Sequence, residues 1–561
     1  MDNTFPWLKN YPKGLRGQLN VDQYSSLVEI FEEGFKKYSD RVAYTCMGKS
    51  LTYAEVDEMS RHVAAYLTQE AGLKKGDRMA IQMPNLLQYP VVLIGALRAG
   101  ITVVNTNPLY TPREMEHQFT DAQVTAVVIL ANFAHNLEKV LPNTSIKTVI
   151  VTEIGDLLGG LKGGIVNFVV KNIKKMVPAY HLPKAITFKK MIAIGKTKSF
   201  EKVAISPSDL AFLQYTGGTT GVAKGAMLTH RNVAAHTIIC QEWFKPIIGN
   251  QDIVITAIPL YHIFALTVNG VLMFASGAHN ILVTNPRDMK AFIGDLKKYP
   301  FTIITGVNTL FNGLLNQEAF KEVDFSHLKV GIGGGMAVQK AVADKWEMVT
   351  GTALVEGYGL SETSPVLCCG PLDGTHRQGT IGLPFPNTEV AIMDDQGNPV
   401  PVGERGEICA RGPQVMPGYW NRPEDNDKVF FHKEWFRTGD VGVMDTDGFI
   451  KIVDRIKDMI LVSGFNVYPN EVEDAMALHP KVLEVAAIGV PDEKSTEAVK
   501  IFVVKKDESL TEDELHAHAH EYLTNYKRPK HIEFKKELPK SNVGKIIRRE
   551  LREEEAKKNN K

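Results

Sequence analysis

Residues 213–225 form a glycine- and threonine-rich stretch whose side chains and backbone could bind phosphate. The stretch reads LQYTGGTTGVAKG and follows an apparent strand at 210–213. Its glycines let the backbone turn tightly and present amide N–H groups to an anion, while hydroxyl groups and one ammonium group add further donors. The predicted phosphate-binding set is Thr216, Gly217, Gly218, Thr219, Thr220, Gly221 and Lys224. Such a loop suits the triphosphate of a nucleotide.

This stretch is not a Walker A loop, because that motif requires Gly-Lys-Ser/Thr after a four-residue spacer and here Lys224 follows Ala223. A Gly/Thr-rich surface turn is the alternative interpretation. The threonine cluster and the lysine that accompany the glycines favour the phosphate loop. A P-loop ATPase is disfavoured because the Gly-Lys-Ser/Thr sequence of that class is missing.

The run TGGTTGVAKG resembles the signature loop of the adenylate-forming superfamily, which includes acyl-CoA synthetases, luciferases and peptide-synthetase adenylation domains. Most members have proline where this chain has Ala223; that position shapes the turn, so we expect little consequence. The resemblance implies ATP and coenzyme A as substrates and Mg²⁺ as cofactor.

Two later runs resemble the adenine and metal motifs of the same superfamily. GGGM at 333–336 and EGYGLSET at 356–363 would enclose the adenine ring, with Tyr358 over one face. The implied adenine-binding residues are Gly333, Gly334, Gly335, Met336, Glu356, Gly357, Tyr358 and Gly359. Glu362, with Thr216, would bind Mg²⁺, which prefers a few carboxylate oxygens together with phosphate and water. A solvated surface glutamate is the alternative for Glu362.

The ribose motif and the domain linker are implied by WFRTGD at 435–440 and VDRIKD at 453–458. Asp440 would accept hydrogen bonds from both ribose hydroxyls, and Arg455 would reach the ribose or phosphate. Asp454 would be the hinge between an AMP-binding N-terminal domain, 1–453, and a mobile C-terminal lid domain, 454–561.

Three further segments carry residues that the resemblance places at the reaction centre. His262, in PLYHIF, would lie near the substrate carboxylate, although this stretch alone favours a hydrogen-bonded core histidine. Lys545, in PKSNVGKIIR, would be the catalytic lysine; viewed alone it would be an ordinary solvated side chain. The loop of Ser463, Gly464 and Phe465 would line the coenzyme A tunnel after the small domain turns.

The segment 435–473 resembles the signature of bacterial long-chain fatty-acid–CoA ligases. The implied reaction joins a long-chain fatty acid to coenzyme A with ATP cleaved to AMP and pyrophosphate, through an acyl-adenylate and a domain rotation between half-reactions. A medium-chain or aryl acid ligase is the alternative within the superfamily. A non-catalytic acyl-binding scaffold is the alternative outside catalysis, but the phosphate loop, Glu362 and Lys545 are all retained.

The elements that must position these residues follow from the apolar pattern. Short apolar runs at 79–83, 101–104, 126–130 and 148–152 alternate with helix-like stretches such as 89–98, and the alternation resumes from 209 to about 356. Strand and helix in alternation predict mostly parallel sheets covered on both faces. We expect an α/β fold whose large N-terminal domain has two such lobes.

After about residue 385 the pattern changes to short strands, at 389–393, 406–410 and 449–453, separated by turn residues. This predicts a small β lobe that completes the N-terminal domain. Strands at 482–490 and 499–504 and a helix at 512–523 then predict a small α+β C-terminal domain.

Composition places further limits on partners and compartment. Lysine plus arginine equals aspartate plus glutamate at 64 each, so the chain has no general field for nucleic acid and we expect none as a partner. Five cysteines without metal spacing suit a reducing compartment. The start, MDNTFPWLKN, has no basic region followed by an apolar core, so we expect a cytoplasmic protein without a secretory signal. The sequence leaves a homodimer open.

The segment 157–198 combines apolar residues at helical spacing with nine lysines. Such a helix could lie on an anionic bilayer, which would place the protein peripherally on the inner face of the cytoplasmic membrane. Alternatively, its apolar stripe packs on the protein. Both interpretations stay open at the level of sequence.

Overall fold

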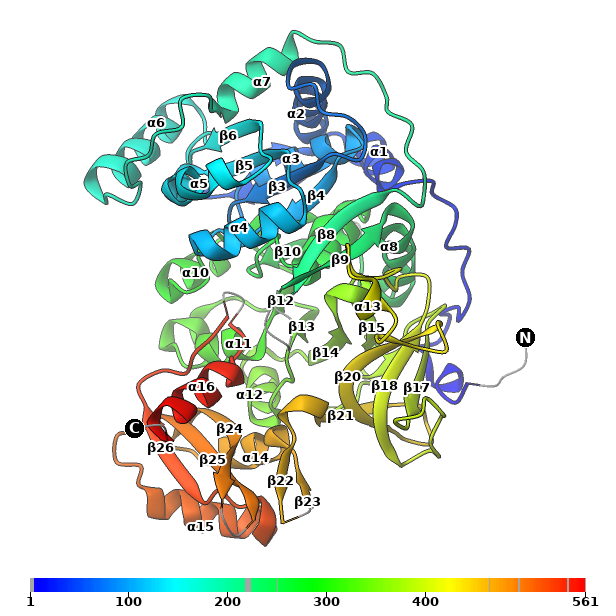
Figure 1. Cartoon of the computed structure of the whole chain (residues 1–561), viewed down its shortest axis with the longest axis vertical. Helices are drawn as coiled ribbons and strands as arrows, with labels where there is room; N and C mark the ends of the chain where they lie inside the picture. The colour runs from blue at the N-terminus through cyan, green and yellow to red at the C-terminus, as the bar shows by residue number, and fades with distance from the viewer. Residues whose placement is uncertain are drawn as a thin grey trace.

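Two large, mostly parallel sheets occupy the first 385 residues, as the alternating pattern predicts (Figure 1). The computed structural model describes residues 5–216, 223–249, 251–463, 465–492, 495–541 and 544–559, with the side chain of Ile456 left out. The described chain forms four sheets in all, and each of the four carries part of the predicted architecture.

The first lobe is built on a seven-stranded sheet in the order β7-β6-β5-β3-β4-β8-β9, in which only the β8–β9 pair is antiparallel. Its strands are β3 (Arg78–Gln82), β4 (Thr102–Asn105), β5 (Ala126–Leu130), β6 (Thr148–Thr152), β7 (Ile186–Thr187), β8 (Leu210–Thr216) and β9 (Lys224–Thr229). Its helices are α2 (Tyr53–Ala65), η2 (Tyr66–Glu70), α3 (Gln88–Arg98), α4 (Pro112–Asp121), η3 (Ala131–Phe133), α5 (Ala134–Val140), η4 (Leu141–Asn143), α6 (Gly160–Phe168), η5 (Val169–Ile173) and α7 (Phe188–Lys196).

The second lobe is built on a nine-stranded sheet in the order β16-β15-β14-β13-β12-β10-β11-β1-β2, parallel from β14 to β1. Its strands are β1 (Val42–Cys46), β2 (Lys49–Thr52), β10 (Ile253–Thr256), β11 (His279–Leu282), β12 (Ile303–Gly306), β13 (Val330–Gly334), β14 (Leu354–Gly359), β15 (Val366–Cys369) and β16 (Leu383–Pro384). Its helices are α1 (Leu27–Tyr38), α8 (His230–Phe244), η6 (Ala265–Leu272), α9 (Met273–Ala275), α10 (Met289–Leu296), α11 (Asn308–Leu315), η7 (Glu318–Glu322), α12 (Lys340–Thr350) and η8 (Ser361–Thr363).

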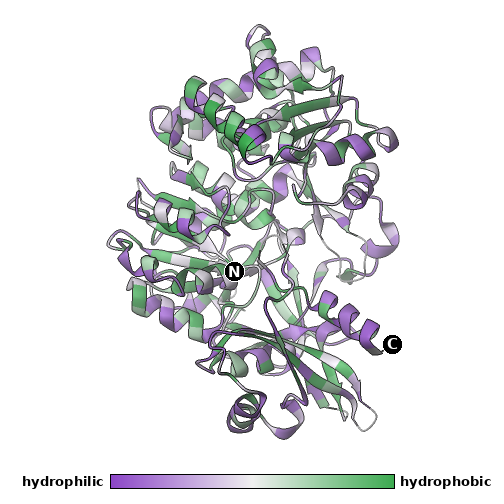
Figure 2. Ribbon diagram, turned by 90° about the vertical axis from the view of Figure 1, so that its left-hand side faces the viewer, coloured by the Kyte–Doolittle hydropathy of each residue, from purple (hydrophilic) through white to green (hydrophobic). Residues whose placement is uncertain are grey.

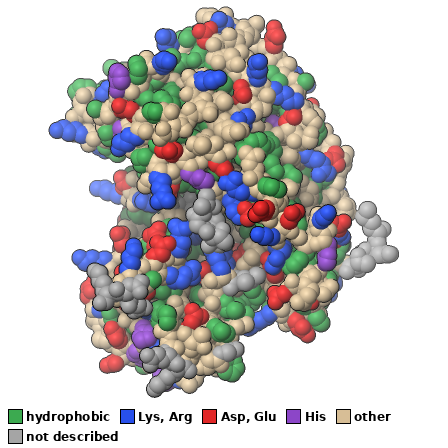
Figure 3. Space-filling view, in the orientation of Figure 1, with side chains coloured by type: hydrophobic (Ala, Val, Ile, Leu, Met, Phe, Trp, Pro, Cys, Tyr) green, Lys and Arg blue, Asp and Glu red, His purple; other side chains and the backbone are tan. Residues whose placement is uncertain are grey.

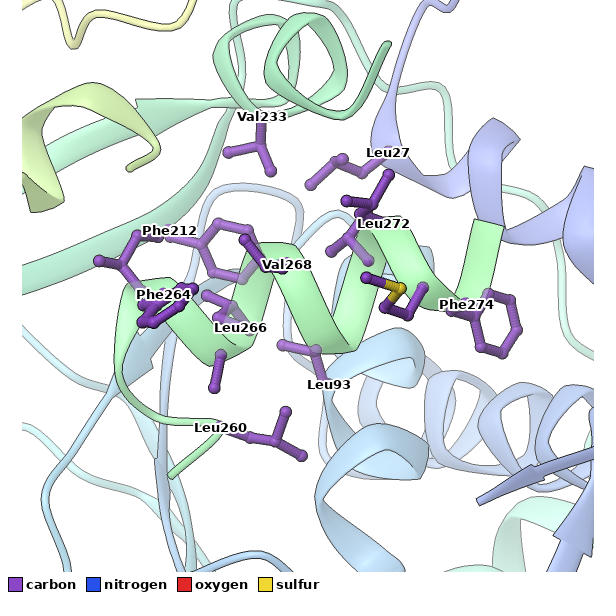
Figure 4. Close-up of a cluster of buried hydrophobic side chains, with 14 of the residues drawn as sticks. Leu27, Leu93, Phe212, Val233, Leu260, Phe264, Leu266, Val268, Leu272 and Phe274 are labelled. Atoms are coloured by element: carbon purple, nitrogen blue, oxygen red, sulfur yellow. The ribbon is translucent and has the colours of Figure 1, made fainter. Parts of the chain in front are cut away.

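The main core lies where the two lobes meet, around η6 and α9 (Figure 4). Leu93 of α3, Phe212 of β8 and Val233 of α8 converge on Leu266, Val268 and Leu272 of this helix, and all six side chains are buried. Figure 2 shows the interior strands as hydrophobic and many outer helix turns as hydrophilic. Burial of this apolar surface from two lobes makes them one rigid support for the residues at their strand ends.

The predicted small β lobe is an antiparallel sheet in the order β17-β18-β20-β19, with β21 paired to β20. Its elements are β17 (Glu389–Met393), β18 (Arg405–Arg411), α13 (Pro423–Asn426), β19 (Phe430–Phe431), β20 (Trp435–Met444) and β21 (Ile450–Arg455). The N-terminal segment with η1 (Leu8–Asn10) packs beside it, where the Asn10 side chain donates to the Asp447 carbonyl at 2.7 Å.

The C-terminal region has its own sheet, in the order β23-β22-β25-β24 with β26 paired to β25, and its own apolar clusters. Its elements are η9 (Ile456–Asp458), β22 (Ile460–Val462), β23 (Phe465–Val467), α14 (Pro469–Ala477), β24 (Val482–Asp492), β25 (Thr496–Lys505), α15 (Glu512–Tyr522), η10 (Asn525–Lys527), β26 (His531–Lys535) and α16 (Arg548–Asn559). The predicted fold class is therefore confirmed: a large α/β domain with a β lobe precedes a small α+β domain.

The segment 157–198 divides between the two interpretations left open above. Phe188 and Met191 of α7 are buried, and α7 packs on α2. By contrast, α6 projects from the edge of the first lobe in Figure 1, with Leu161 exposed to 83%. Packing on the protein thus accounts for the apolar residues of α7 and not for those of α6. Within the described residues, no helix is both long and apolar enough to span a bilayer.

Candidate active site

The predicted phosphate loop is bracketed by the ends of the β8–β9 hairpin. Thr216 and Lys224 are opposite each other in this antiparallel pair, as its last register partners. The predicted residues Gly217, Gly218, Thr219, Thr220 and Gly221 lie outside the described residues. Lys224 forms an ion pair with Asp425 at 2.9 Å, and its Nζ lies 5.5 Å from the centroid of the Tyr419 ring. The two strand ends that flank the loop are therefore adjacent, and one of them carries the Lys224 ammonium group, which Asp425 holds in position.

The predicted adenine-binding residues come together at the carboxyl ends of two adjacent parallel strands. In the β13–β14 pair, Gly333 lies opposite Glu356 and Gly334 opposite Gly357. A Cβ at Gly334 would approach the Phe264 ring to 2.9 Å, and Gly335 has a φ of +77°, so side chains are poorly tolerated here. Ligands of open α/β sheets bind beyond this strand edge. Met336 follows directly and is half-buried.

Tyr358, Asp440 and Arg455 form a hydrogen-bonded row across the site. The Tyr358 hydroxyl donates to Asp440 Oδ2 at 2.7 Å, and Arg455 Nε lies 3.0 Å from Asp440 Oδ1. Asp440 and Arg455 are register partners in the β20–β21 pair, so the β lobe itself sets their spacing. Burial raises the pKa of Tyr358 well above its usual value, and the phenol therefore stays a hydrogen-bond donor.

Glu362 provides a buried carboxylate beside the phosphate hairpin. Its side chain is 7% exposed, its Oε1 accepts a hydrogen bond from the Tyr419 hydroxyl at 2.6 Å, and η8 packs against β8 and β9. No cluster of three acidic, histidine or cysteine side chains suited to a metal occurs among the residues that the structure describes. One buried carboxylate packed against β8, the strand that ends at Thr216, fits a Mg²⁺ ion that takes its other ligands from phosphate and water.

Lys545 reaches this site from the C-terminal region, about a hundred residues after Asp440. Burial and then the positive charge of Arg455 lower the pKa of Lys545 to about 7, while Asp440 acts in the opposite direction. The charge of Lys545 in turn contributes, after burial, to lowering the pKa of His262 to about 4. The structure therefore brings Lys545, His262, Asp440 and Arg455 together, with the imidazole neutral at physiological pH.

The backbone around Lys545 is also held in place. The Ser541 N–H donates to the Lys545 carbonyl at 2.7 Å, and the Lys545 N–H donates to the Ser541 hydroxyl at 3.1 Å. Gly544, with a φ of +81°, forms the turn before the lysine. A solvated lysine in a basic tail would need none of these contacts.

Asp454 lies between the β lobe and the C-terminal sheet and is fully buried. Its carboxylate accepts hydrogen bonds from the backbone N–H groups of Arg455 at 2.7 Å and Asn470 at 2.8 Å. Arg548 Nη1 lies 3.7 Å from the same carboxylate, and its other nitrogens bind Glu473 at 2.7 and 2.9 Å. Burial raises the pKa of Asp454 to about 6 despite the arginine.

Among the predicted site residues that the structure describes, those of the coenzyme A loop lie away from the others. Phe465 is 57% exposed and stacks on Tyr526 with ring centroids 4.8 Å apart. The Ser463 N–H donates to the Ser495 carbonyl at 2.7 Å, and Gly464 lies outside the described residues. In Figure 1 the β22–β23 hairpin points away from α11, whereas the chain just before α16 contacts α11 through the hydrogen bond from the Thr309 hydroxyl to the Gly544 carbonyl at 2.9 Å.

Several side chains at the site carried no sequence signal of their own. Tyr419 binds Glu362, and Asp425 pairs with Lys224. They reach the site only because the β lobe folds back on the phosphate hairpin. Neither their spacing nor their residue type singles them out in the chain. Figure 3 shows a hollow on the face of the molecule in view, with Lys and Arg side chains at its rim.

Comparison with known proteins agrees with this geometry. The family described as AMP-binding enzyme matches residues 31–420, and that described as AMP-binding enzyme C-terminal domain matches residues 471–545. The chain therefore belongs to the AMP-binding enzyme family. Among curated relatives, the long-chain-fatty-acid–CoA ligase of Yersinia pestis is 56% identical over 552 residues, covering 98% of each chain.

Solved structures share the arrangement of both domains. The anthranilate CoA ligase AuaEII in complex with anthranoyl-AMP matches with a TM-score of 0.84 at 24% identity, over 95% of this chain and 98% of that one. ATP-bound MatB from Rhodopseudomonas palustris matches with a TM-score of 0.80 at 27% identity, over 94% and 98%. Apo MatB, over the same shares, gives 0.71. The present arrangement is thus closer to the ATP-bound form of that protein.

Proposed function

We propose that this chain is a long-chain fatty-acid–CoA ligase, which converts a long-chain fatty acid, ATP and coenzyme A to acyl-CoA, AMP and pyrophosphate through an acyl-adenylate. The likeness to the Yersinia pestis ligase extends over nearly the whole of both chains. The observation that carries the proposal is the arrival of Lys545 from the C-terminal domain beside His262 and Arg455. An ammonium group at this position reduces the repulsion between two anions, the fatty carboxylate and the ATP phosphates, that must approach each other to react.

In the first half-reaction a carboxylate oxygen attacks the α-phosphorus of ATP, and the bond to the β-phosphate breaks as pyrophosphate leaves. Lys545 bridges the fatty carboxylate and the α-phosphate, which lowers their repulsion and stabilises the charge of the transition state. Neutral His262 orients the carboxylate, and Lys224 with the loop amides binds the triphosphate. Mg²⁺ at Glu362 and Thr216 supplies further charge neutralisation of the phosphates when bound. Adenine lies between Tyr358 and the glycines of β13.

In the second half-reaction the coenzyme A thiolate attacks the acyl carbonyl, and the bond to AMP breaks. Support for a rotation about Asp454 comes from the β22–β23 hairpin, which points away from α11 (Figure 1) and whose Phe465 is 57% exposed. Rotation removes Lys545 and brings this hairpin to the site, so that one site serves two reactions. On this proposal the N-terminal domain is 1–453 and the mobile domain 454–561.

A panel of acids tests the proposed substrate. Purified chain is given ATP, Mg²⁺, coenzyme A and acids from acetate to a sixteen-carbon chain, with benzoate as the aryl member, and acyl-CoA is measured by mass spectrometry. We expect kcat/KM to rise with chain length, because each buried methylene adds about 0.8 kcal/mol of binding. A preference for benzoate or for medium-chain acids would replace the proposed substrate by one of those alternatives. Absence of any acyl-CoA would refute the ligase proposal.

We also propose that α6 and η5 contact the anionic inner face of the cytoplasmic membrane. Four apolar side chains on α6 and η5, and Met176 just after them, are exposed, from 52% to 83%: Leu161, Ile165, Phe168, Ile173 and Met176. The opposite face of α6 is anchored, since a Cβ on Gly163 would lie 2.2 Å from the Gly155 carbonyl oxygen and Asn167 binds Glu153 at 2.8 Å.

Charge supports the same partner. Residues 157–200 contain nine lysines and no aspartate or glutamate. Figure 3 shows hydrophobic and basic side chains together along the edge where Figure 1 places α6. An apolar stripe flanked by lysines binds a bilayer by combining burial with attraction to anionic headgroups.

Sedimentation with vesicles of phosphatidylglycerol and phosphatidylethanolamine tests this contact. We expect wild-type protein to pellet with these vesicles, less so at high salt, and the double variant Leu161→Ser, Phe168→Ser to stay in the supernatant. Met348→Ser on α12 is the matched control, because Met348 is also 83% exposed but lies outside this segment. Equal pelleting of all three proteins, or no pelleting of wild type, would rule the membrane contact out.

A further inference from the structure

Helix α11 is fixed to the large domain through one face. Phe311 packs edge-on against Trp346 of α12, with ring centroids 4.9 Å apart, and both are fully buried. At its first turn, Asn308 exchanges two hydrogen bonds with Gln339, at 3.0 and 3.2 Å. The helix therefore forms a rigid platform at the carboxyl end of β12.

The other face of α11 carries two polar side chains that bind the C-terminal domain. The Thr309 hydroxyl donates to the Gly544 carbonyl at 2.9 Å, and the Asn312 side-chain amide donates to the Leu483 carbonyl at 3.0 Å. Residues three apart lie on the same side of a helix, so the two bonds form one contact. Both acceptors are backbone carbonyls, whose positions are set by the C-terminal domain as a whole.

The first of these bonds lies directly beside the catalytic segment. Gly544 immediately precedes Lys545, and a Cβ on Gly544 would lie 2.7 Å from Thr309 Oγ1 and 3.3 Å from Val307 Cγ2. Glycine thus allows the backbone to approach α11 closely. The same peptide that delivers Lys545 to the nucleotide residues is seated on Thr309.

We propose that Thr309 and Asn312 are positioning residues that hold the C-terminal domain in the arrangement that forms the adenylate. The two hydrogen bonds exist only while Lys545 is in the site, and both must break before the domain can rotate. Their strength therefore sets the balance between the two half-reactions. The inference rests on the proposed function and adds to it the contact that selects the first of the two arrangements.

The test measures the two half-reactions separately in Thr309→Val and Asn312→Ala. We expect each substitution to slow acid-dependent ATP–pyrophosphate exchange about 2- to 10-fold, the range for loss of one net hydrogen bond. Thioester formation from supplied acyl-AMP and coenzyme A should be unchanged or faster, because the released domain rotates more readily. Thr309→Ser keeps the hydroxyl and should restore the exchange rate.

Controls separate this effect from general damage. Thr120→Val, on the exposed end of α4, is the matched threonine substitution and should change neither rate. Thermal melting of each variant identifies any loss of folding, and the two positions provide independent tests. Unchanged exchange in both variants, or equal loss in both half-reactions with an unaltered melting temperature, would overturn the inference. Failure of wild type to form acyl-CoA would instead refute the function on which it rests.

Discussion

At the scale of single residues, the site combines charges that come from separate parts of the chain. Lys545 faces Arg455 and Asp440, and its pKa is lowered to about 7 chiefly by burial. A cation so placed is costly without an anion, since desolvation disfavours the charged form. ATP and a carboxylate supply that anion. Without these substrates, the buried Lys545 is therefore the group to which an anion would bind.

Replacing Lys545 by alanine tests its proposed role. We expect Lys545→Ala to lower acid-dependent pyrophosphate exchange by about 10²- to 10³-fold, as for other removed transition-state donors. Thioester formation from supplied acyl-AMP should be largely retained, because the lysine has left the site by then. Lys540→Ala, which breaks an ion pair with Glu484 outside the site, is the control. Equal loss of both half-reactions would argue against the assignment.

The lowered pKa of Lys545 is itself measurable. Only the neutral amine reacts with acetic anhydride, so pulse labelling read by mass spectrometry should show half-maximal reaction of Lys545 near the value of about 7. Solvated lysines titrate at about 10.4. Bound ATP should shift the Lys545 midpoint upward, because phosphate charge favours the ammonium form. A Lys545 that titrates with the solvated lysines in the absence of ATP would contradict this environment.

The metal role of Glu362 gives a third prediction at this scale. Glu362→Gln removes the negative charge of the side chain but keeps its shape. We expect the Mg²⁺ concentration for half-maximal adenylate formation to rise about 10- to 100-fold, because loss of a hydrogen-bond partner of a metal ligand already lowers metal affinity by this factor. Tyr419→Phe removes only the hydrogen bond at 2.6 Å and should have the smaller effect. An unchanged Mg²⁺ dependence in Glu362→Gln would exclude the carboxylate as a ligand.

At the scale of elements, much of the scaffold was predictable from local pattern. The apolar runs at 126–130 and 148–152 are β5 and β6 without change, and the predicted helix 512–523 is α15 within one residue. Capping boxes explain several helix starts, as at Thr111 with Glu114 in α4. The predicted strand at 210–213 continues to Thr216, because pairing with β9 extends it.

The parts that local pattern did not predict are set by long-range contacts. The apolar spacing in α6 resembles that in α7, yet α7 has α2 to pack on and α6 is exposed at the lobe edge. Likewise, Tyr419 contacts Glu362, about 57 residues before it in the chain, and Asp425 contacts Lys224, about 201 residues before it. The resemblance named Lys545 and Asp440, whereas periodicity alone would have left both on the surface.

Substitution of Asp454, the proposed hinge, should separate the two steps. Asp454→Pro fixes φ and restricts rotation, so we expect thioester formation from acyl-AMP to fall more than adenylate formation. Asp454→Ala is the matched control, since it also removes the carboxylate that binds Asn470 and Arg548 but leaves φ free. A proline variant that loses adenylate formation first would place the hinge elsewhere.

At the scale of the whole molecule, the two lobes and the C-terminal domain divide the work. The lobes share a buried core around η6 (Figure 4), and this core supports the strands β8, β13 and β14 whose ends form the site. The C-terminal domain has separate apolar clusters and can therefore turn as a unit. On the proposed function, the lobes hold the nucleotide in a fixed position while the C-terminal domain presents first one segment and then another to it. One site can therefore catalyse two reactions in sequence.

The position of bound nucleotide tests this account most directly. A crystal structure with ATP or acyl-AMP should place adenine beside Tyr358 and Gly334, the ribose on Asp440, and Lys545 Nζ about 3 Å from the α-phosphate or acyl oxygen. Its phosphates should enter the loop between Thr216 and Lys224. A nucleotide found away from both Tyr358 and this loop would contradict the account.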